Sequence, residues 1–291
     1  MNAFLNRSRL LLQLVKFEHT IFALPFALIS FLLAIRRSSG GFHGVTLFWI
    51  VVAMVGARSA AMAFNRLIDA EYDGRNPRTA SRHLPAGLLS RAQVTLFLAV
   101  AVILFEVAAW RLNPLCLLLS PVALGAVLGY SYTKRFTAFC HLFLGFAIGI
   151  APVGAWIAVR GTFDMTPLLL GGAVMFWIGG FDIIYALQDY DFDRDAGLFS
   201  LPKAIGKANA LKVSRLVHAL AVAILIAVGR LEHLHLLYFA GVLVVAGLIL
   251  YEQRLVKPDD LSRVDMAFFT LNGWVSVSLF AFVLMDSLLL R

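Results

Sequence analysis

Acidic and amide side chains recur at four-residue spacing in two stretches of the sequence. Asn65, Asp69 and Asp73 stand at positions i, i+4 and i+8, which places them along one stripe of a helix. We call these three residues the first Asp stripe. Asp189 and Asp193 repeat the i, i+4 relation further along the chain. Because like charges at this spacing repel one another, the pattern indicates a ligand that offsets the repulsion.

Mg²⁺ fits this requirement, since it is a hard cation that takes one or two carboxylates together with substrate phosphate oxygens. Two facing clusters of Asp therefore predict one metal and diphosphate site, with Asp69, Asp73, Asp189 and Asp193 as the metal ligands. The alternative is that each cluster is a solvated helix end. One cluster alone would favour that interpretation, whereas the matched pair favours the site.

Basic residues follow the acidic ones. Arg78 and Arg82 come after the first Asp stripe, and Lys134 and Arg135 directly follow an apolar run. Such groups bind phosphate and stabilise a departing pyrophosphate. Lys134 and Arg135 are equally consistent with the general excess of basic residues in cytoplasmic loops.

Two further charges lie inside apolar segments. Arg58 precedes Asn65 by about two helical turns, and Asp182 precedes Asp189 by the same distance, so each lies about 10 Å deeper than its motif. Charges within a membrane are usually paired or functional. We expect Arg58 and Asp182 to approach each other beneath the metal site, either as a structural ion pair or with Arg58 binding a carboxylate of the substrate.

The elements that position these residues are long and apolar. The chain has 291 residues, of which 60% are hydrophobic and 14% charged, and its mean hydropathy is +0.84. This composition indicates an integral membrane protein, and continuous apolar runs indicate helices, so the fold class is all-α. The net charge of +8 resides in short loops, which argues against a nucleic-acid partner.

Nine apolar segments have about the length needed to cross a bilayer. We place them at about 20–36, 45–68, 92–110, 114–132, 138–159, 167–187, 213–230, 235–251 and 266–289. No soluble segment separates them, so residues 1–291 are expected to form a single transmembrane domain surrounded by membrane lipid.

The distribution of Lys and Arg predicts the orientation of the chain. We expect the chain to span the inner membrane. If its N-terminus lies in the cytoplasm, most basic residues fall on the cytoplasmic side. Both acidic clusters then face the cytoplasm, and each is followed by a basic loop. This weak internal repeat predicts two halves that converge on one cavity opening to the cytoplasm.

Cysteine and histidine offer no further metal motif. Cys116 and Cys140 are far apart inside apolar segments and are expected to pack against neighbours. His141 and His218 are expected to cap helices or to pack, because their spacing matches no zinc site.

Four motifs together resemble the UbiA family of intramembrane aromatic prenyltransferases. They are Asn65-x-x-x-Asp69-x-x-x-Asp73, Arg78-Thr79-x-x-Arg82-x-Leu84-x-x-Gly87, Tyr130 to Lys134-Arg135, and Tyr185-x-x-x-Asp189-x-x-x-Asp193. The resemblance implies Mg²⁺, a polyprenyl diphosphate donor and an aromatic acid acceptor in the biosynthesis of quinones such as ubiquinone or menaquinone.

Two positions depart from the family pattern and bear on the acceptor. Arg66 stands where the first motif often has Asp, and His83 stands where Pro is usual. The resulting form is similar to a subgroup described as 4-hydroxybenzoate polyprenyltransferase-like, which includes the prenylating enzyme of the futalosine route to menaquinone. The implied acceptor is therefore either 4-hydroxybenzoate or a dihydroxynaphthoate.

The expected chemistry assigns a role to each residue. Asp69, Asp73, Asp189 and Asp193, aided by Asn65, would hold Mg²⁺ on the diphosphate, while Lys134, Arg135 and Arg82 neutralise the leaving group. The remaining substrate-binding candidates are Arg58, Arg78, Tyr185 and Asp182. A secondary transporter is the alternative function, and its site would lie near the membrane midplane.

Overall fold

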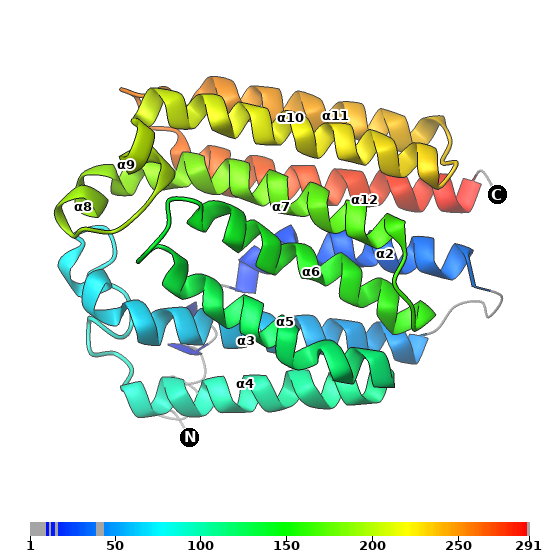
Figure 1. The fold of residues 1–291 in the computed structure, drawn as a ribbon, viewed down its shortest axis with the longest axis horizontal. Helices are drawn as coiled ribbons and strands as arrows, with labels where there is room; N and C mark the ends of the chain where they lie inside the picture. The colour runs from blue at the N-terminus through cyan, green and yellow to red at the C-terminus, as the bar shows by residue number, and fades with distance from the viewer. Residues whose placement is uncertain (1–9, 12, 15–16, 39–43, 290–291) are drawn as a thin grey trace.

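The computed structural model describes residues 10–11, 13–14, 17–38 and 44–289, which are helical almost throughout (Figure 1). The elements are η1 Phe17–Phe22, α2 Leu24–Arg36, α3 Gly44–Arg75, α4 Arg91–Leu112, α5 Pro114–Thr133, α6 Cys140–Arg160, α7 Met165–Ala186, η2 Leu187–Asp189, α8 Tyr190–Asp195, α9 Leu201–Ile205, α10 Lys207–Leu231, α11 Leu236–Leu255, η3 Met266–Leu271 and α12 Asn272–Leu289. Within these residues, eight helical segments are long and apolar enough to cross a membrane, and the shorter apolar helix Thr20–Arg36 accompanies them. The predicted all-α bundle of about nine membrane helices is confirmed.

The predicted segments match these helices closely, with two informative differences. Helix α3 continues to Arg75, so the first Asp stripe lies within the helix and not beyond its end. Helix α7 ends at Ala186 and gives way to a short 3-10 turn, η2, before α8 begins at Tyr190. The second acidic cluster therefore lies on an interrupted helix.

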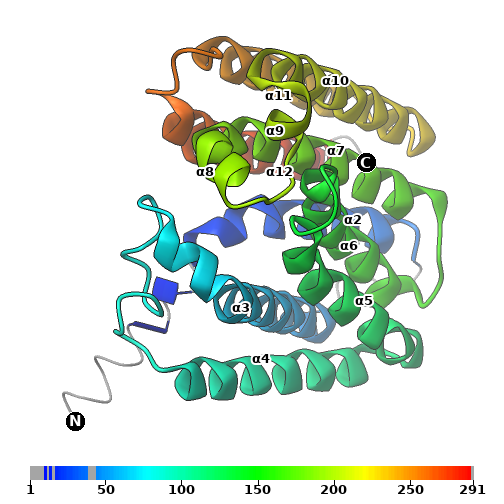
Figure 2. The ribbon, with the colours of Figure 1, turned by 60° about the vertical axis from the view of Figure 1, so that its left-hand side comes forward.

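The helices pack in two similar groups. In the first group α3 packs on α4, and both contact α5; in the second α7 packs on α10, which contacts α11. Helices α2 and α6 pack on each other, and α6 also packs on α7, which joins the two groups (Figure 2). The helices that carry the two acidic clusters, α3 and α7, thus occupy corresponding places in the two groups.

Helices α6 and α7 approach each other closely because glycines face one another. A Cβ atom on Gly145 would overlap the backbone carbonyl of Met175, and one on Gly149 would overlap that of Gly171. Small residues of this kind let helix backbones approach within a membrane bundle. This contact fixes α7 against α6, which starts beside the loop that carries Lys134.

The outer surface of the bundle is apolar. Leu118, Leu236 and Leu243 are 73%, 81% and 74% exposed, respectively, whereas the interior contains fully covered aromatic side chains such as Trp156 and Phe26. A surface of this composition suits contact with lipid and not with water. The chain is therefore a multi-pass membrane protein.

The connections that follow α3, α5 and α7 lie at the same end of the bundle as α8 and α9, on the left in Figure 1. We call this the cavity end. The chain is ordered there by short motifs: Ser90 and Gln93 form a reciprocal capping box that starts α4, and the side chain of Ser200 caps α9.

Candidate active site

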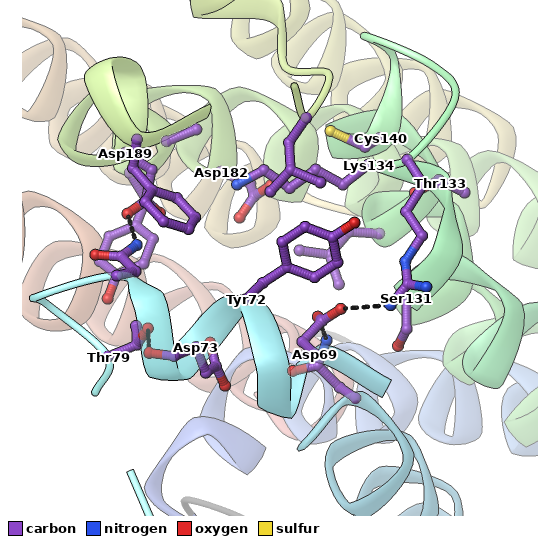
Figure 3. Close-up of a pocket in the computed structure, with 18 of the residues that line it drawn as sticks. Asp69, Tyr72, Asp73, Thr79, Ser131, Thr133, Lys134, Cys140, Asp182 and Asp189 are labelled. Atoms are coloured by element: carbon purple, nitrogen blue, oxygen red, sulfur yellow. Dashed lines mark hydrogen bonds and ion pairs between the residues drawn. The ribbon is translucent and has the colours of Figure 1, made fainter. Parts of the chain in front are cut away.

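A polar cavity of about 230 Å³ opens at the cavity end between α3, α5, α6 and α7 (Figure 3). It is lined by most of the side chains that the sequence predicted, namely Asn65, Asp69, Asp73, Arg78, Arg82, Lys134, Arg135, Asp182, Tyr185 and Asp189. Arg58 and Asp193 are the predicted site residues that do not line it. The two halves of the chain therefore contribute to one cavity, as predicted.

The first Asp stripe faces the cavity along regular helix α3. The side-chain amide of Asn65 donates to Asp69 Oδ2 at 2.8 Å, and Arg135 Nη2 lies 3.4 Å from Asp69 Oδ1. Arg82 Nη1 donates to Asp73 Oδ1 at 2.6 Å. Each carboxylate of the stripe is thus held by a guanidinium group from outside α3.

Asp189 joins the two halves of the molecule. Arg78, in the loop after α3, donates to both of its carboxylate oxygens, from Nε at 3.0 Å and from Nη2 at 2.6 Å. The amide of Asn76 donates to the same carboxylate at 2.9 Å, and Arg78 Nη1 donates to the Tyr185 hydroxyl at 2.9 Å. Bidentate pairs of this kind fix orientation as well as charge.

Asp193 behaves differently from the prediction. Its side chain is fully buried and pairs with Lys134 Nζ at 2.7 Å, and it does not line the cavity. The 3-10 turn at Leu187–Asp189 changes the helical register, so Asp189 and Asp193 do not share a stripe. The expectation of a second continuous stripe is therefore wrong.

Lys134 and Arg78 remain charged at neutral pH. Burial disfavours the ammonium form of Lys134, but the carboxylates of Asp193 and Asp189 more than compensate and raise its pKa above the usual value. The pKa of Arg78 is likewise raised: burial opposes the charge, and the bond to Asp189 outweighs it. The cavity thus presents fixed positive charge beside its carboxylates.

The donor chemistry of the cavity fits Mg²⁺. Its acidic and amide oxygens are hard ligands, and the buried Asp73 Oδ2 makes no hydrogen bond, with Arg66 Nη1 3.9 Å away. Among the described residues no three His, Cys, Asp or Glu side chains converge to hold an ion by themselves. Phosphate oxygens would have to complete the coordination, which is the usual arrangement for Mg²⁺ bound with a nucleotide or diphosphate.

The two deeper charges do not pair with each other. Asp182 Oδ2 lies 2.7 Å from His141 Nδ1, across the interface of α6 and α7, whereas Arg58 lies near Tyr130 on α5 and acts on it electrostatically. The prediction that Asp182 pairs with Arg58 is therefore wrong. Asp182 lines the cavity, and Arg58 lies outside its lining.

Several lining residues were not among the predicted site residues. Tyr72 projects into the middle of the cavity from α3 (Figure 3), and the guanidinium of Arg135 lies over its ring at 5.3 Å. His141 and Cys140 were expected only to pack or cap, yet both line the cavity. Tyr72 could have been found from its place inside the acidic motif, whereas His141 becomes visible only when α6 is placed against α7.

Arg66 and His83 are the two departures from the family pattern. Arg66 is 6% exposed and approaches Asn65 Oδ1 at 3.4 Å. Burial, with a smaller contribution from the Arg66 charge, lowers the pKa of His83, so His83 is neutral at pH 7. Neither residue lines the cavity.

Comparison with known proteins places the chain clearly. Residues 23–274 match the model of the UbiA prenyltransferase family. The 4-hydroxybenzoate octaprenyltransferase of Tolumonas auensis is 32% identical over 253 residues, which are 87% of this chain and 88% of that protein. The enzyme of the same name from Nitrosospira multiformis is 32% identical over 238 residues, covering 82% and 81% of the two chains.

Solved structures share the fold. A UbiA homolog from Aeropyrum pernix K1 is 35% identical and superimposes with a TM-score of 0.84 over 93% of this chain and 98% of that one. A UbiA homolog from Archaeoglobus fulgidus bound to DMAPP and Mg²⁺ is 19% identical, with a TM-score of 0.70 over 96% and 99% of the two chains.

The family match covers most of the chain and includes both helices that carry the acidic clusters. It decides against a secondary transporter, as does the position of the cavity at the helix ends and not at the midplane. The chain belongs to the UbiA prenyltransferase family.

Proposed function

We propose that this protein transfers a polyprenyl group from polyprenyl diphosphate to 4-hydroxybenzoate in a Mg²⁺-dependent reaction that releases diphosphate. The observation that carries the proposal is the cavity in which Asp69, Asp73 and Asp189 meet four basic side chains from loops at the cavity end. The names of the relatives from Tolumonas and Nitrosospira supply the acceptor. The pathway that would use the product is ubiquinone biosynthesis.

Mg²⁺ would be held by Asp69, Asp73 and Asp189, with the amide of Asn65 orienting Asp69. When bound, the ion supplies positive charge that stabilises the departing diphosphate. The buried Asp193 has a supporting role in this scheme, because its pairing with Lys134 holds the ammonium group at the cavity wall. Asp193 is therefore assigned to hold Lys134 and not, as the sequence predicted, to bind the metal.

Arg78, Arg82, Lys134 and Arg135 bind the diphosphate. Each is paired with a carboxylate, so the acidic residues orient the basic ones before the donor arrives. Preorganised cations of this kind stabilise negative charge as it develops on the leaving oxygen. They do so without reorganising water, because the apolar bundle excludes it.

The reaction itself needs little covalent chemistry from the protein. The C–O bond of the donor breaks with its electron pair going to diphosphate, which leaves an allylic cation. The rings of Tyr72, Tyr130 and Tyr185 line the cavity and present π faces to that cation. A carbon of the electron-rich acceptor ring then attacks it, and a ring proton leaves.

The orientation of the chain follows from its charges. Arg75, Arg91 and Lys207 are among the basic residues at the cavity end. The opposite end has fewer basic residues, among them Arg37, Arg111 and Arg160. On the positive-inside rule we propose that the cavity end and the N-terminus lie on the cytoplasmic side of the inner membrane. The N-terminal residues 1–9 themselves lie outside the described part of the chain.

The test is direct. Purified protein in lipid nanodiscs is incubated with Mg²⁺, geranyl diphosphate or a longer donor, and either 4-hydroxybenzoate or a dihydroxynaphthoate, and the product is identified by mass. We expect C-prenylated 4-hydroxybenzoate, and no product when EDTA replaces Mg²⁺. Prenylation of the naphthoate alone would overturn the acceptor assignment, and product without a divalent cation would overturn the metal assignment.

A further inference from the structure

The pair formed by Asp182 and His141 has no part in the chemistry described so far. Asp182 is on α7 and lines the cavity together with Tyr130, Leu144 and His141. It is about two helical turns from Asp189, towards the interior of the bundle. Its side chain is 21% exposed, whereas that of His141 is 3% exposed. Asp182 is therefore the more exposed member of the pair, and His141 is almost fully buried beside it.

The hydrogen bonds of His141 fix the position of its ring. The backbone N–H of Leu201, at the start of α9, donates to His141 Nε2 at 3.3 Å. This contact ties the ring to the start of α9. On the other side of the ring, Nδ1 lies 2.7 Å from Asp182 Oδ2, so the imidazole holds that carboxylate oxygen in place.

One of the two carboxylate oxygens of Asp182 is available to a ligand in the cavity. Oδ2 of Asp182 accepts from His141, while Oδ1 makes no hydrogen bond to any of the described residues. Basic side chains surround the mouth of the cavity and pair with the other four carboxylates. Asp182 instead has a buried histidine as its partner, and no Lys or Arg among the described residues forms an ion pair with it.

We propose that Asp182 Oδ1 accepts the phenolic proton of the aromatic acceptor as the ring carbon attacks the allylic carbon, and that His141 is the positioning residue that orients Asp182. The proposal rests on the proposed function, because it requires a phenol as acceptor. An anionic group on the cavity wall attracts the O–H end of a hydroxybenzoate and repels its carboxylate. It therefore orients the acceptor as well as activating the carbon next to the hydroxyl.

The step balances. The ring π electrons form the new C–C bond, the donor C–O bond breaks with its electron pair leaving on diphosphate, and the phenolic proton passes to Asp182. The immediate product is a neutral dienone in place of a cationic ring. Loss of the proton from the prenylated ring carbon to diphosphate or water restores aromaticity, while Asp182 returns its proton to the phenolic oxygen.

The test compares wild type with Asp182→Asn on two acceptors, 4-hydroxybenzoate and 3-fluoro-4-hydroxybenzoate, whose phenol is more acidic. Removal of a general base lowers kcat by about 10²–10⁴-fold, and we expect this loss for 4-hydroxybenzoate. The loss should be clearly smaller for the fluorinated acceptor, because a more acidic phenol depends less on a base. Ring deactivation by fluorine affects both proteins and cancels in the ratio.

Two controls separate this role from others. The KM for geranyl diphosphate and the Mg²⁺ concentration for half-maximal activity should not change in Asp182→Asn; a large rise in the latter would make Asp182 a metal ligand and overturn the proposal. The same loss with both acceptors would also overturn it. If wild type prenylates neither acceptor, the proposed function fails first.

The positioning role of His141 has its own matched pair of variants. In His141→Asn the amide nitrogen can replace Nδ1 as donor to Asp182, whereas His141→Phe removes the donor, and both leave the Leu201 N–H without its imidazole acceptor. We expect the Asn variant to keep most of the wild-type kcat, and the Phe variant to show the acceptor dependence of Asp182→Asn. Equal losses in both variants, with unchanged melting temperatures in detergent, would refute the positioning role.

Discussion

The two acidic clusters look alike in sequence but differ in structure. On α3 the helix is regular, and Asn65, Asp69 and Asp73 all reach the cavity. After α7 a 3-10 turn interrupts the helix, so Asp189 reaches the cavity while Asp193 turns away and pairs with Lys134. The same four-residue spacing thus places both Asp69 and Asp73 in the cavity. In the second cluster it places Asp189 in the cavity and Asp193 in a buried ion pair with Lys134.

The largest effect is expected where the two clusters are equivalent. Asp69→Asn and Asp189→Asn each remove a cavity carboxylate without changing side-chain volume. We expect each to lower kcat by about 10²–10³-fold or more, the loss typical of removing one preorganised electrostatic group, with the Mg²⁺ concentration for half-maximal activity raised. Steady-state kinetics across a Mg²⁺ series measures both. Near-normal turnover in either variant would show that Asp69 and Asp189 are not equivalent in the reaction.

A second effect is expected where the clusters differ. Asp193→Asn leaves the Lys134 ammonium without its counter-ion, so we expect the variant to lose about 2 kcal/mol of stability; this is below the value for a fully buried pair because Lys134 is 33% exposed. Thermal unfolding in detergent measures the loss. The double variant Asp193→Leu with Lys134→Met should regain stability but not activity, since Lys134 is missing from the diphosphate site. Recovery of activity would make Lys134 dispensable.

A smaller effect is expected from Arg66, for which the second cluster has no counterpart. Its guanidinium lies 3.9 Å from Asp73 Oδ2 and competes with a metal ion for that carboxylate. Arg66→Gln should therefore lower the Mg²⁺ concentration for half-maximal activity several-fold, with kcat little changed. Isothermal titration with Mn²⁺ as the probe gives an independent value. A higher Mg²⁺ requirement would show that Arg66 orients Asp73 instead.

The smallest effects are expected from acidic residues that belong to the clusters but face away from the cavity. Glu71 forms an exposed i,i+4 pair with Arg75, which contributes about 0.3–0.5 kcal/mol, and Asp191 is exposed. Glu71→Gln and Asp191→Asn should leave kcat and the Mg²⁺ requirement unchanged. They are therefore the matched controls for Asp69→Asn and Asp189→Asn, and a loss of activity would show that overall charge and not position matters.

Local periodicity accounts for what could be predicted from the sequence. The nine apolar segments and the first Asp stripe follow from hydropathy and the helical repeat, and both are found. The interruption after Ala186 could not be predicted, because neither Gly nor Pro stands between Ala186 and Asp193 to indicate it. The pairing of Asp182 could not be predicted either. Its partner, His141, is on α6, and the sequence does not show that α6 packs against α7.

The glycine contact between α6 and α7 has a consequence for catalysis as well as for packing. Gly145 is one helical turn from His141, and its contact with Met175 sets the spacing of the two helices that carry His141 and Asp182. A side chain at Gly145 would push the helices apart and lengthen the 2.7 Å hydrogen bond between them. A residue that touches no substrate would then control the alignment of a proton acceptor, so Gly145→Ala would be mistaken for a catalytic variant in any screen that reads activity alone.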